Sequence, residues 1–187
     1  RVRGPVGLAD LFCMMNIDRP DLKDTPYAPS VPDRLERDPD IFHAIKQRDI
    51  ILFHPYESFQ PVIKFLEAAA HDPDVLAIKM TLYRTGTNSP IVQALLDARE
   101  HGKAVSVLVE LKARFDEENN IGWARALERA GAHVVFGIMG LKVHAKLCLV
   151  VRKEKSGIVR YVHMSSGNYN AVTAKIYTDI GLFTTNE

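Results

Sequence analysis

His144 and Lys146 are the residues whose types and spacing could do chemistry, in the segment GLKVHAKLCLVV. Two residues apart on an extended strand, their side chains would share one face of a sheet. A neutral imidazole is a nucleophile, and a lysine beside it can hold an anionic substrate. The apolar residues that follow predict a buried strand, which would keep both side chains in place. The pair therefore predicts phosphorus chemistry with His144 as the attacking group.

A turn of small and amide residues follows the next predicted strand, in SSGNYN. The small residues 165–167 allow the backbone to approach a ligand closely, and Asn168 can orient an imidazole or bind an oxygen atom. His163 lies nearer to this turn, but it has no lysine two residues later. A single strand histidine is more commonly a core residue hydrogen-bonded to backbone, and this alternative stays open for both histidines. Lys146 favours His144 as the functional one.

Basic residues follow two successive predicted strands. Arg84 comes after VLAIKMTLY, and Lys112 and Arg114 come after KAVSVLVEL. Ligands of an open α/β sheet gather at the carboxyl ends of its parallel strands, so these cations are expected at one edge. The TGTNS stretch after Arg84 also leads into a helix amino terminus, whose free N–H groups favour phosphate oxygens. The residues fit a polyanion cradle, and the alternative is solvated charges or ion pairs with the carboxylates of DEEN.

Composition excludes several classes of protein. The chain has 187 residues, of which 47% are hydrophobic and 25% charged, as in ordinary globular domains. Its 24 basic and 23 acidic residues give a formal net charge of +1, so bulk charge does not indicate nucleic acid as a partner. No apolar stretch approaches the ~20 residues of a membrane span. Cys13 and Cys148 are far apart, which favours a reduced, cytosolic setting.

Strand and helix patterns alternate along residues 49–187, which we expect to form one catalytic domain. Strands are predicted in DIILFH, VLAIKMTLYR, KAVSVLVEL and AHVVFGI, with helices between them. This alternation predicts an α/β fold with a mainly parallel, mixed sheet and helices on both faces. LKVHAKLCLVVRK and IVRYVHMSS predict an antiparallel hairpin near the carboxy end, before a last strand near IGLF. Residues 1–48, rich in turn formers, are expected to be a partly irregular junction or arm from a preceding domain.

Several segments together resemble the first carboxy-terminal domain of type 1 polyphosphate kinase. They are HPYESF, DVLAIKMTLYRTG, SPIVQAL, VLVELKARFDEENNIGWARALERAGAHVVFG, GLKVHAK, RYVH, SGNYN and TAKIYTDIGLF. The resemblance runs from about His54 to Phe183. It implies a phospholipase D-like fold, with an HxK histidine on each of two related halves, of which this chain holds the first. We expect the chain to be a fragment of a longer, homo-oligomeric protein.

The resemblance implies reversible transfer of the terminal phosphate of ATP to inorganic polyphosphate through a phosphohistidine. His144 matches the histidine that becomes phosphorylated, and Tyr177 matches a tyrosine that contacts ATP. Arg84 and Arg114 match positions of the family's magnesium site. A guanidinium has no free lone pair, so we expect these arginines to bind phosphate oxygens that also coordinate Mg²⁺.

Further expectations follow for the site and the partners. We infer that Lys146 balances charge on the phosphoryl oxygens and that Asn168 helps to fix the imidazole ring. The expected partners are ATP or ADP and inorganic polyphosphate, with no nucleic acid. The isolated fragment is expected to be inactive, because the second half of the site would be missing. The expected location is the cytoplasm, with or without peripheral attachment to the inner face of the membrane.

Two other functions fit part of the pattern. A phospholipase D-like nuclease or phosphatidyl transferase shares HxK and the Gly-Asn turn. The acidic residue that usually follows HxK in that superfamily is absent, with Val151 and Arg152 standing near the place. A non-catalytic polyanion-binding module would keep the fold without turnover. The joint presence of the predicted site residues argues against such a loss of catalysis; these are His144, Lys146, Arg84, Arg114 and Tyr177.

Overall fold

The computed structural model describes residue 4 and residues 7–111, 117–137 and 140–186. Within these ranges the strands are β1 (Ile50–His54), β2 (Val75–Leu82), β3 (Ala104–Val109), β4 (His133–Phe136), β5 (Lys146–Glu154), β6 (Gly157–Ser165) and β7 (Asp179–Thr184). The α-helices are α1 (Asp33–Arg37), α2 (Ile41–Gln47), α3 (Gln60–His71), α4 (Pro90–Glu100) and α5 (Glu117–Arg129). Short 3₁₀ helices are η1 (Leu8–Asn16), η2 (Pro20–Leu22) and η3 (Thr173–Lys175).

The strands form one mixed sheet in the order β1-β7-β6-β5-β2-β3-β4. The predicted hairpin is β5 and β6, which pair from Lys146↔Ser165 to Glu154↔Gly157. The α/β class, the mixed sheet and the hairpin are therefore confirmed. The parallel part is smaller than predicted: β2, β3 and β4 are parallel neighbours, and the other four pairs are antiparallel. The reason is that β5, β6 and β7 lie between β1 and β2.

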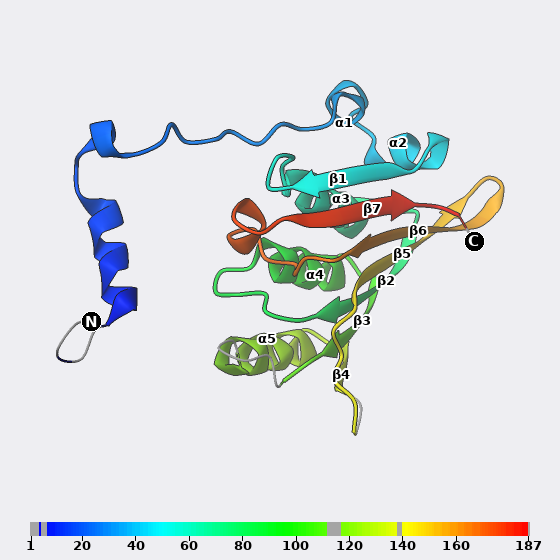
Figure 1. The fold of residues 1–187 in the computed structure, drawn as a ribbon. Coiled ribbons are helices and arrows are strands. Elements are labelled where there is room, and N and C mark those ends of the chain that lie inside the picture. The colour runs from blue at the N-terminus through cyan, green and yellow to red at the C-terminus, as the bar shows by residue number, and fades with distance from the viewer. Residues whose placement is uncertain (1–3, 5–6, 112–116, 138–139, 187) are drawn as a thin grey trace.

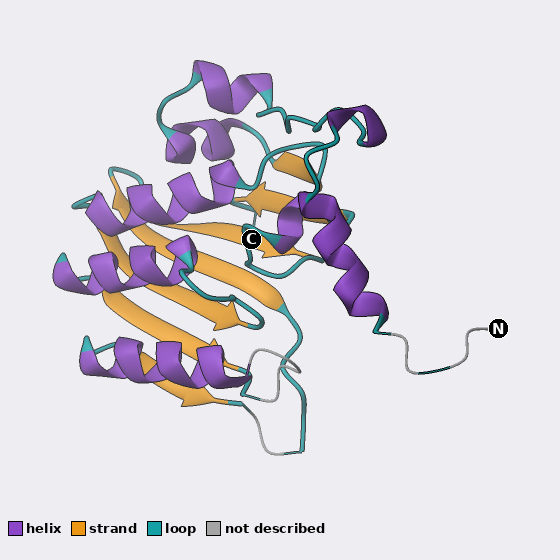
Figure 2. Ribbon diagram, turned by 90° about the vertical axis from the view of Figure 1, so that its left-hand side faces the viewer, coloured by secondary structure: helices purple, strands orange, loops and turns teal. Residues whose placement is uncertain are grey.

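Helices α2, α3, α4 and α5 lie against the same face of the sheet (Figures 1 and 2). The prediction of helices on both faces is wrong in this detail. The burial pattern of β2 shows the same one-sided cover: Ile78, Met80 and Leu82 are buried, whereas Leu76 and Lys79 are exposed. The crossovers from β1 to β2, β3 and β4 all proceed in one direction across the sheet. Right-handed crossovers in one direction place their helices on one face, and covering both faces requires a reversal of strand order.

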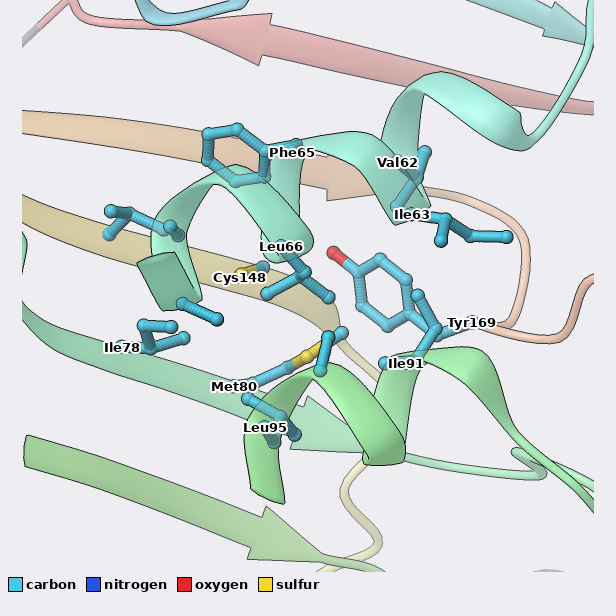
Figure 3. Packing of buried hydrophobic residues seen from close by; sticks show 14 of the residues in the cluster. Val62, Ile63, Phe65, Leu66, Ile78, Met80, Ile91, Leu95, Cys148 and Tyr169 are labelled. Carbon is cyan, nitrogen blue, oxygen red and sulfur yellow. The ribbon is translucent and has the colours of Figure 1, made fainter. Parts of the chain in front are cut away.

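The core lies between this face and the helices α3 and α4. Leu66 of α3 and Ile91 and Leu95 of α4 pack near Ile78 and Met80 of β2 (Figure 3). None of these five side chains is more than 3% exposed. Burying each one stabilises the fold by about 1.5–3 kcal/mol. The core therefore holds β2 firmly, and β2 leads directly into the segment that carries Arg84.

Local sequence signals set the ends of α4. Ser89 caps it by accepting the Val92 amide at 3.4 Å, and Pro90 takes the first helical position, as predicted. Gly102, at φ 77°, follows the helix in the left-handed region that glycine adopts easily. These signals place the start of α4 close after Arg84.

The part of the chain before α2 lies largely away from the sheet (Figure 1). All residues of η1 are exposed. In contrast, α2 buries Ile41, Phe42, Ala44 and Ile45 in the core, although it precedes the expected domain boundary at residue 49. That boundary stays a prediction.

Several connections meet at one edge of the sheet. β2, β3 and β6 end at this edge, and β5 and β7 begin there, because β5 and β7 run antiparallel to their neighbours. The residues that the edge carries are Arg84 after β2, Glu110 after β3, His144 before β5, the turn 166–170 after β6, and Asp179 at the start of β7. Ligands of open α/β sheets bind outside the carboxyl ends of the parallel strands, so this edge is the place for a site.

Candidate active site

A pocket of about 480 Å³ lies at this edge of the sheet. Five of the six predicted site residues line it, although they are far apart in the sequence: Arg84, His144, Lys146, Asn168 and Tyr177. The sixth, Arg114, lies outside the described residues. The fold therefore gathers the described members of the predicted site into one cavity.

His144 lies just before β5, and Lys146 is the first residue of that strand. The Lys146 Nζ atom lies 3.0 Å from both ring nitrogens of His144 and donates to the His144 carbonyl oxygen at 2.7 Å. A neutral imidazole has one in-plane lone pair, on the nitrogen without a proton, so the ammonium can donate to at most one of the two ring nitrogens. His144 is exposed, whereas Lys146 is only 5% exposed. The two side chains are adjacent, as their spacing predicts.

Thr81 of β2 holds the backbone that follows His144. Its hydroxyl donates to the carbonyl oxygen of Ala145 at 2.7 Å and accepts from the amide of Leu147 at 3.0 Å. These two bonds tie the beginning of β5 to the firmly packed β2. The position of His144 along this edge therefore depends on a contact between strands that are more than sixty residues apart in sequence, because Thr81 and Ala145 are separated by 64 positions.

Tyr83 lies beside His144 at the centre of a cluster of cations. Its buried ring meets the His144 ring edge to face, with centroids 4.9 Å apart and an interplanar angle of 72°. Lys146 Nζ, Lys142 Nζ and Arg84 Cζ lie 5.1, 5.6 and 5.3 Å from the Tyr83 centroid. The negative face of an aromatic ring attracts cations by about 0.5–1 kcal/mol each at exposed sites. Tyr83 therefore gathers positive charge beside the imidazole, which suits an anionic ligand.

The surroundings of His144 keep its imidazole neutral. Although the side chain is exposed, partial desolvation by the surrounding protein lowers its pKa below the ordinary 6.5, and the charges of Lys146, Lys142 and Arg84 lower it further. A neutral imidazole has the lone pair that nucleophilic attack requires. The pKa of Lys146 is lowered mainly by burial, while the Asp179 carboxylate opposes that shift and Arg84 adds to it. Asp179 therefore favours the charged form of Lys146.

The turn after β6 packs closely against Asp179. Ser166 Oγ donates to Asp179 Oδ1 at 2.8 Å and accepts from the amide of Ile180 at 3.0 Å. A Cβ atom on Gly167 would lie 2.6 Å from Asp179 Cγ, so a side chain at this position would clash. The close backbone approach that small residues allow here is made to Asp179, which itself lines the pocket.

Arg84 has an unusual backbone conformation, with φ 52° in the left-handed region. That region costs a non-glycine residue roughly 1–2 kcal/mol. Asn170 stabilises it by donating from Nδ2 to the Arg84 carbonyl oxygen at 3.1 Å. The Asn170 Oδ1 atom accepts from the amides of Val172 and Thr173. Strained backbone of this kind clusters at functional sites, and here it links the Arg84 segment to the turn after β6.

His163 is fully buried and therefore closed to a substrate. Burial and the neighbouring His54 lower its pKa to about 3. Its Nδ1 atom lies 3.0 Å from the hydroxyl of Tyr169, and the same hydroxyl is 3.1 Å from the His163 carbonyl oxygen. His163 thus anchors the buried Tyr169, and with it the turn that carries Asn168.

The other predicted residues occupy the wall and the rim of the pocket. Asn168 is half-buried, and Tyr177 is 63% exposed. Lys146 and Tyr83 make the ring contacts described above, and a contact of Asn168 with the His144 ring stays a prediction. The position of Tyr177 beside an open pocket leaves its ring accessible to a ligand.

Three further contributors were not predicted from the sequence: Tyr83, Asn170 and Asp179. Each lies within two positions of a predicted residue, since Tyr83 precedes Arg84, and Asn170 and Asp179 follow Asn168 and Tyr177. An aromatic or polar residue flanking a predicted site residue at a strand end is the signal that could have indicated them. Their contacts join different connections, which a reading along the chain does not reveal.

The described part of the chain holds neither a cluster of metal-ligating side chains nor a helix that could span a membrane. There, no group of three or more His, Cys, Asp or Glu side chains is placed to hold a metal ion. The helices in the same ranges are too short or too polar to cross a bilayer.

The architecture is shared with solved phospholipase D-like proteins. The phospholipase D family member Nuc from Salmonella typhimurium matches with a TM-score of 0.56 at 16% identity, over 74% of this chain and 83% of its own. This likeness shows a phospholipase D-like fold, as the resemblance implied.

The family follows from closer relatives. The crystal structure of polyphosphate kinase from Porphyromonas gingivalis matches with a TM-score of 0.81 at 40% identity, over 97% of this chain and 30% of that chain. A polyphosphate kinase from Prosthecochloris aestuarii is 60% identical over 186 residues, which cover 100% of this chain and 26% of the relative. The family model of polyphosphate kinase C-terminal domain 1 matches residues 40–187. The chain belongs to the polyphosphate kinase family, and it spans about a quarter of the length of that relative.

Proposed function

We propose that this chain is the first catalytic half of a polyphosphate kinase that transfers the terminal phosphate of ATP, reversibly, to inorganic polyphosphate through a phosphohistidine on His144. The observation that carries the proposal is an exposed imidazole with a lowered pKa, with the Lys146 ammonium 3.0 Å from its ring nitrogens. Arg84 and Tyr177 line the same pocket. Family membership supports the choice of polyphosphate as acceptor.

The reaction has two steps that use the same nitrogen. A ring nitrogen of His144 attacks the terminal phosphorus of ATP, a nitrogen–phosphorus bond forms, and the bond from phosphorus to the bridging oxygen breaks as ADP leaves. A terminal oxygen of polyphosphate then attacks the phosphorus, the nitrogen–phosphorus bond breaks, and the chain grows by one phosphate. Covalent catalysis of this kind divides one difficult transfer into two easier ones. Each step runs in reverse when ADP is the acceptor.

The cations would stabilise charge on the transferring group. Phosphoryl transfer depends mainly on positioning and on electrostatic stabilisation of the phosphoryl oxygens. The Lys146 ammonium, beside the His144 ring, would balance charge on these oxygens, and the planar Arg84 guanidinium would grip the nucleotide phosphates. Asn168, in the pocket wall, would help to orient the imidazole. Tyr177 at the rim would contact the nucleotide.

Mg²⁺ fits this pocket as an ion held largely by the substrate phosphates. It is usually bound through one or two carboxylates together with phosphates and water. The described lining includes the carboxylate of Asp179, whereas the Arg84 guanidinium has no lone pair for a metal. Asp179 would be the protein ligand, and Arg84 and Arg114 would contact the same phosphates. Bound Mg²⁺ would neutralise charge on the transferring phosphoryl group.

Labelling of the full-length protein that contains this domain tests the proposal. With ATP labelled at the terminal phosphate, we expect acid-labile, base-stable label on the wild-type protein and none on the His144→Ala variant. His133→Ala is the matched control, because His133 is exposed at the start of β4 and does not line the pocket. Label on the control should equal that on the wild type.

Three outcomes would contradict the proposal in different ways. Label that survives His144→Ala would exclude His144 as the phosphorylated residue. A labelled phosphatidyl or nucleotide product would favour the phospholipase D-like alternative. Tight polyphosphate binding without any label would favour a non-catalytic module.

A further inference from the structure

Three buried polar side chains lie under the connections that carry the site. Glu110, Asn120 and Thr85 are 4%, 1% and 3% exposed. Burying polar groups costs free energy unless hydrogen bonds compensate, and a carboxylate costs the most. Apolar residues of similar size would fill this space more cheaply. The polar side chains are therefore best explained by the particular backbone groups that they bind.

The Glu110 carboxylate binds the residue next to His144. Its Oε2 atom accepts from the amide of Val143 at 2.8 Å, across 33 positions of sequence. Glu110 immediately follows strand β3, in which Val105, Val107 and Val109 are buried, and its own amide donates to the Leu82 carbonyl oxygen of β2 at 3.1 Å. The Glu110 carboxylate is therefore fixed to the sheet. It binds the connection on the amino side of His144, and Thr81 binds the backbone on the carboxyl side.

Helix α5 binds both the Glu110 backbone and the connection after β2. Asn120 Nδ2 donates to the Glu110 carbonyl oxygen at 3.0 Å. The Trp123 indole N–H donates to the Gly86 carbonyl oxygen at 2.8 Å, and the Thr85 hydroxyl makes a weak contact with Asn120 Oδ1 at 3.5 Å. Thr85 and Gly86 directly follow Arg84. One helix therefore contacts both Glu110 and the connection that carries Arg84.

We propose that Glu110 is a positioning residue, which sets the place of His144 relative to the phosphate-binding Arg84 by holding the Val143 amide from β3. The inference rests on the proposed function, since it assigns a role in His144 phosphorylation. Glu110 acts through the backbone and does not line the pocket. What it supplies is a hydrogen-bond acceptor at a fixed position.

The test measures the single-turnover rate of His144 labelling in the full-length protein, over a range of ATP concentrations. Glu110→Ala removes the acceptor, and we expect the maximal rate to fall about 10- to 100-fold because small displacements of a reacting group are costly. The ATP concentration for half-maximal rate should change little. Glu110→Gln keeps an acceptor oxygen and should stay within about threefold of the wild type, since most of the hydrogen bond survives.

Two further variants separate positioning from general loss of structure. Asn120→Ala should slow labelling in the same manner but by less, because it loosens Glu110 without removing it. Glu67→Ala, at an exposed carboxylate on α3, is the matched control and should leave the rate unchanged. Amide hydrogen exchange gives a readout that does not depend on activity: protection of Val143 should be lost in Glu110→Ala and kept in Glu110→Gln, with unchanged protection in β2.

Each alternative result has a distinct meaning. A wild-type rate in Glu110→Ala would overturn the inference. Equal losses in Glu110→Gln and Glu110→Ala would also overturn it, because they would show that charge and not the acceptor matters. Absence of label on the wild-type protein would instead refute the proposed function, while the exchange result for Val143 would still report on the contact itself.

Discussion

At the scale of single residues, the site combines an exposed imidazole with a buried cation. His144 is open to solvent, and the Lys146 ammonium beside it is almost fully enclosed. Partial desolvation and positive neighbours both disfavour protonation of the imidazole, so they lower the pKa of His144 together. The same neighbours that would attract a phosphate therefore also disfavour protonation of the imidazole.

Replacing Lys146 tests whether its charge lowers the pKa of His144. Labelling of His144 requires the neutral ring, so its rate should fall as pH drops through the His144 pKa, below about 6.5 in the wild type. Lys146→Met removes a charge that lowers this pKa while keeping a long apolar stem. The acidic limb of the pH–rate profile should then move to higher pH. An NMR titration of His144 in this chain would give the same shift without substrate.

Lys142→Met is the matched control for that experiment. Lys142 also lowers the pKa of His144, after Lys146 in size, and it is exposed. Its removal should move the limb in the same direction but by less. A limb that stays in place or moves to lower pH in Lys146→Met would show that Lys146 does not set the protonation of His144.

At the scale of elements, the turn after β6 depends on an anchor below the pocket. Tyr169 and His163 are both buried and bonded to each other, so the turn is tied to β6 from inside. Within the described residues, the His163 Nε2 atom is buried without a hydrogen-bond partner, which makes a second proton on this ring costly. The anchor therefore requires a neutral His163.

The stability of the fold should decrease in mild acid because of this anchor. The pKa of His163 is about 3 in the folded chain and close to 6.5 in the unfolded chain. Between these values the unfolded state binds more protons, so stability is lost as pH falls. From pH 7 to pH 5 this one group should reduce the free energy of unfolding by about 2 kcal/mol.

Urea denaturation of the chain at pH 7 and pH 5 measures this effect. His163→Gln has no titrating ring, so its stability difference between the two pH values should be smaller than that of the wild type by about the same 2 kcal/mol. The exposed variant His133→Gln is the control and should retain the wild-type difference. An unchanged difference in His163→Gln would mean that another group causes the acid sensitivity.

At the scale of the whole molecule, the chain spans only part of the length of its relatives. The chain covers 26% of its relative from Prosthecochloris aestuarii and 30% of the solved chain from Porphyromonas gingivalis. Its pocket is lined by the imidazole of His144, by the cations Arg84 and Lys146, and by the exposed Tyr177. Phosphoryl transfer gains its rate from a fully assembled and enclosed electrostatic environment.

We therefore predict that residues 1–187 alone synthesise little or no polyphosphate from ATP. Activity of this chain should be at least about 100-fold below that of the full-length protein at equal molar concentration, since missing electrostatic groups each cost about that much. Measuring acid-insoluble labelled product checks this. Circular dichroism must show that the chain is folded, and robust synthesis by the folded chain would contradict the prediction.

Much of the fold was predictable because its signals are local. The cap Ser89, Pro90 at the first helical position and Gly102 after the helix mark α4 through contacts within a few residues. Apolar runs mark the strands in the same way. The prediction that helices cover both faces was wrong, because the face on which α3, α4 and α5 lie depends on the direction of each crossover across the whole sheet.

The sequence by itself determined that His144 and Lys146 are neighbours, since two positions on one extended segment suffice for that. It also determined the family, through motifs that are read along the chain. Only the tertiary structure decided that Tyr83, Asp179 and Glu110 contact the segments that form the pocket. Their contacts join residues that are tens of positions apart, and such contacts form only when strand order and register bring separate connections to one edge. Local propensity carries no information about that order, because it arises from long-range packing of the sheet.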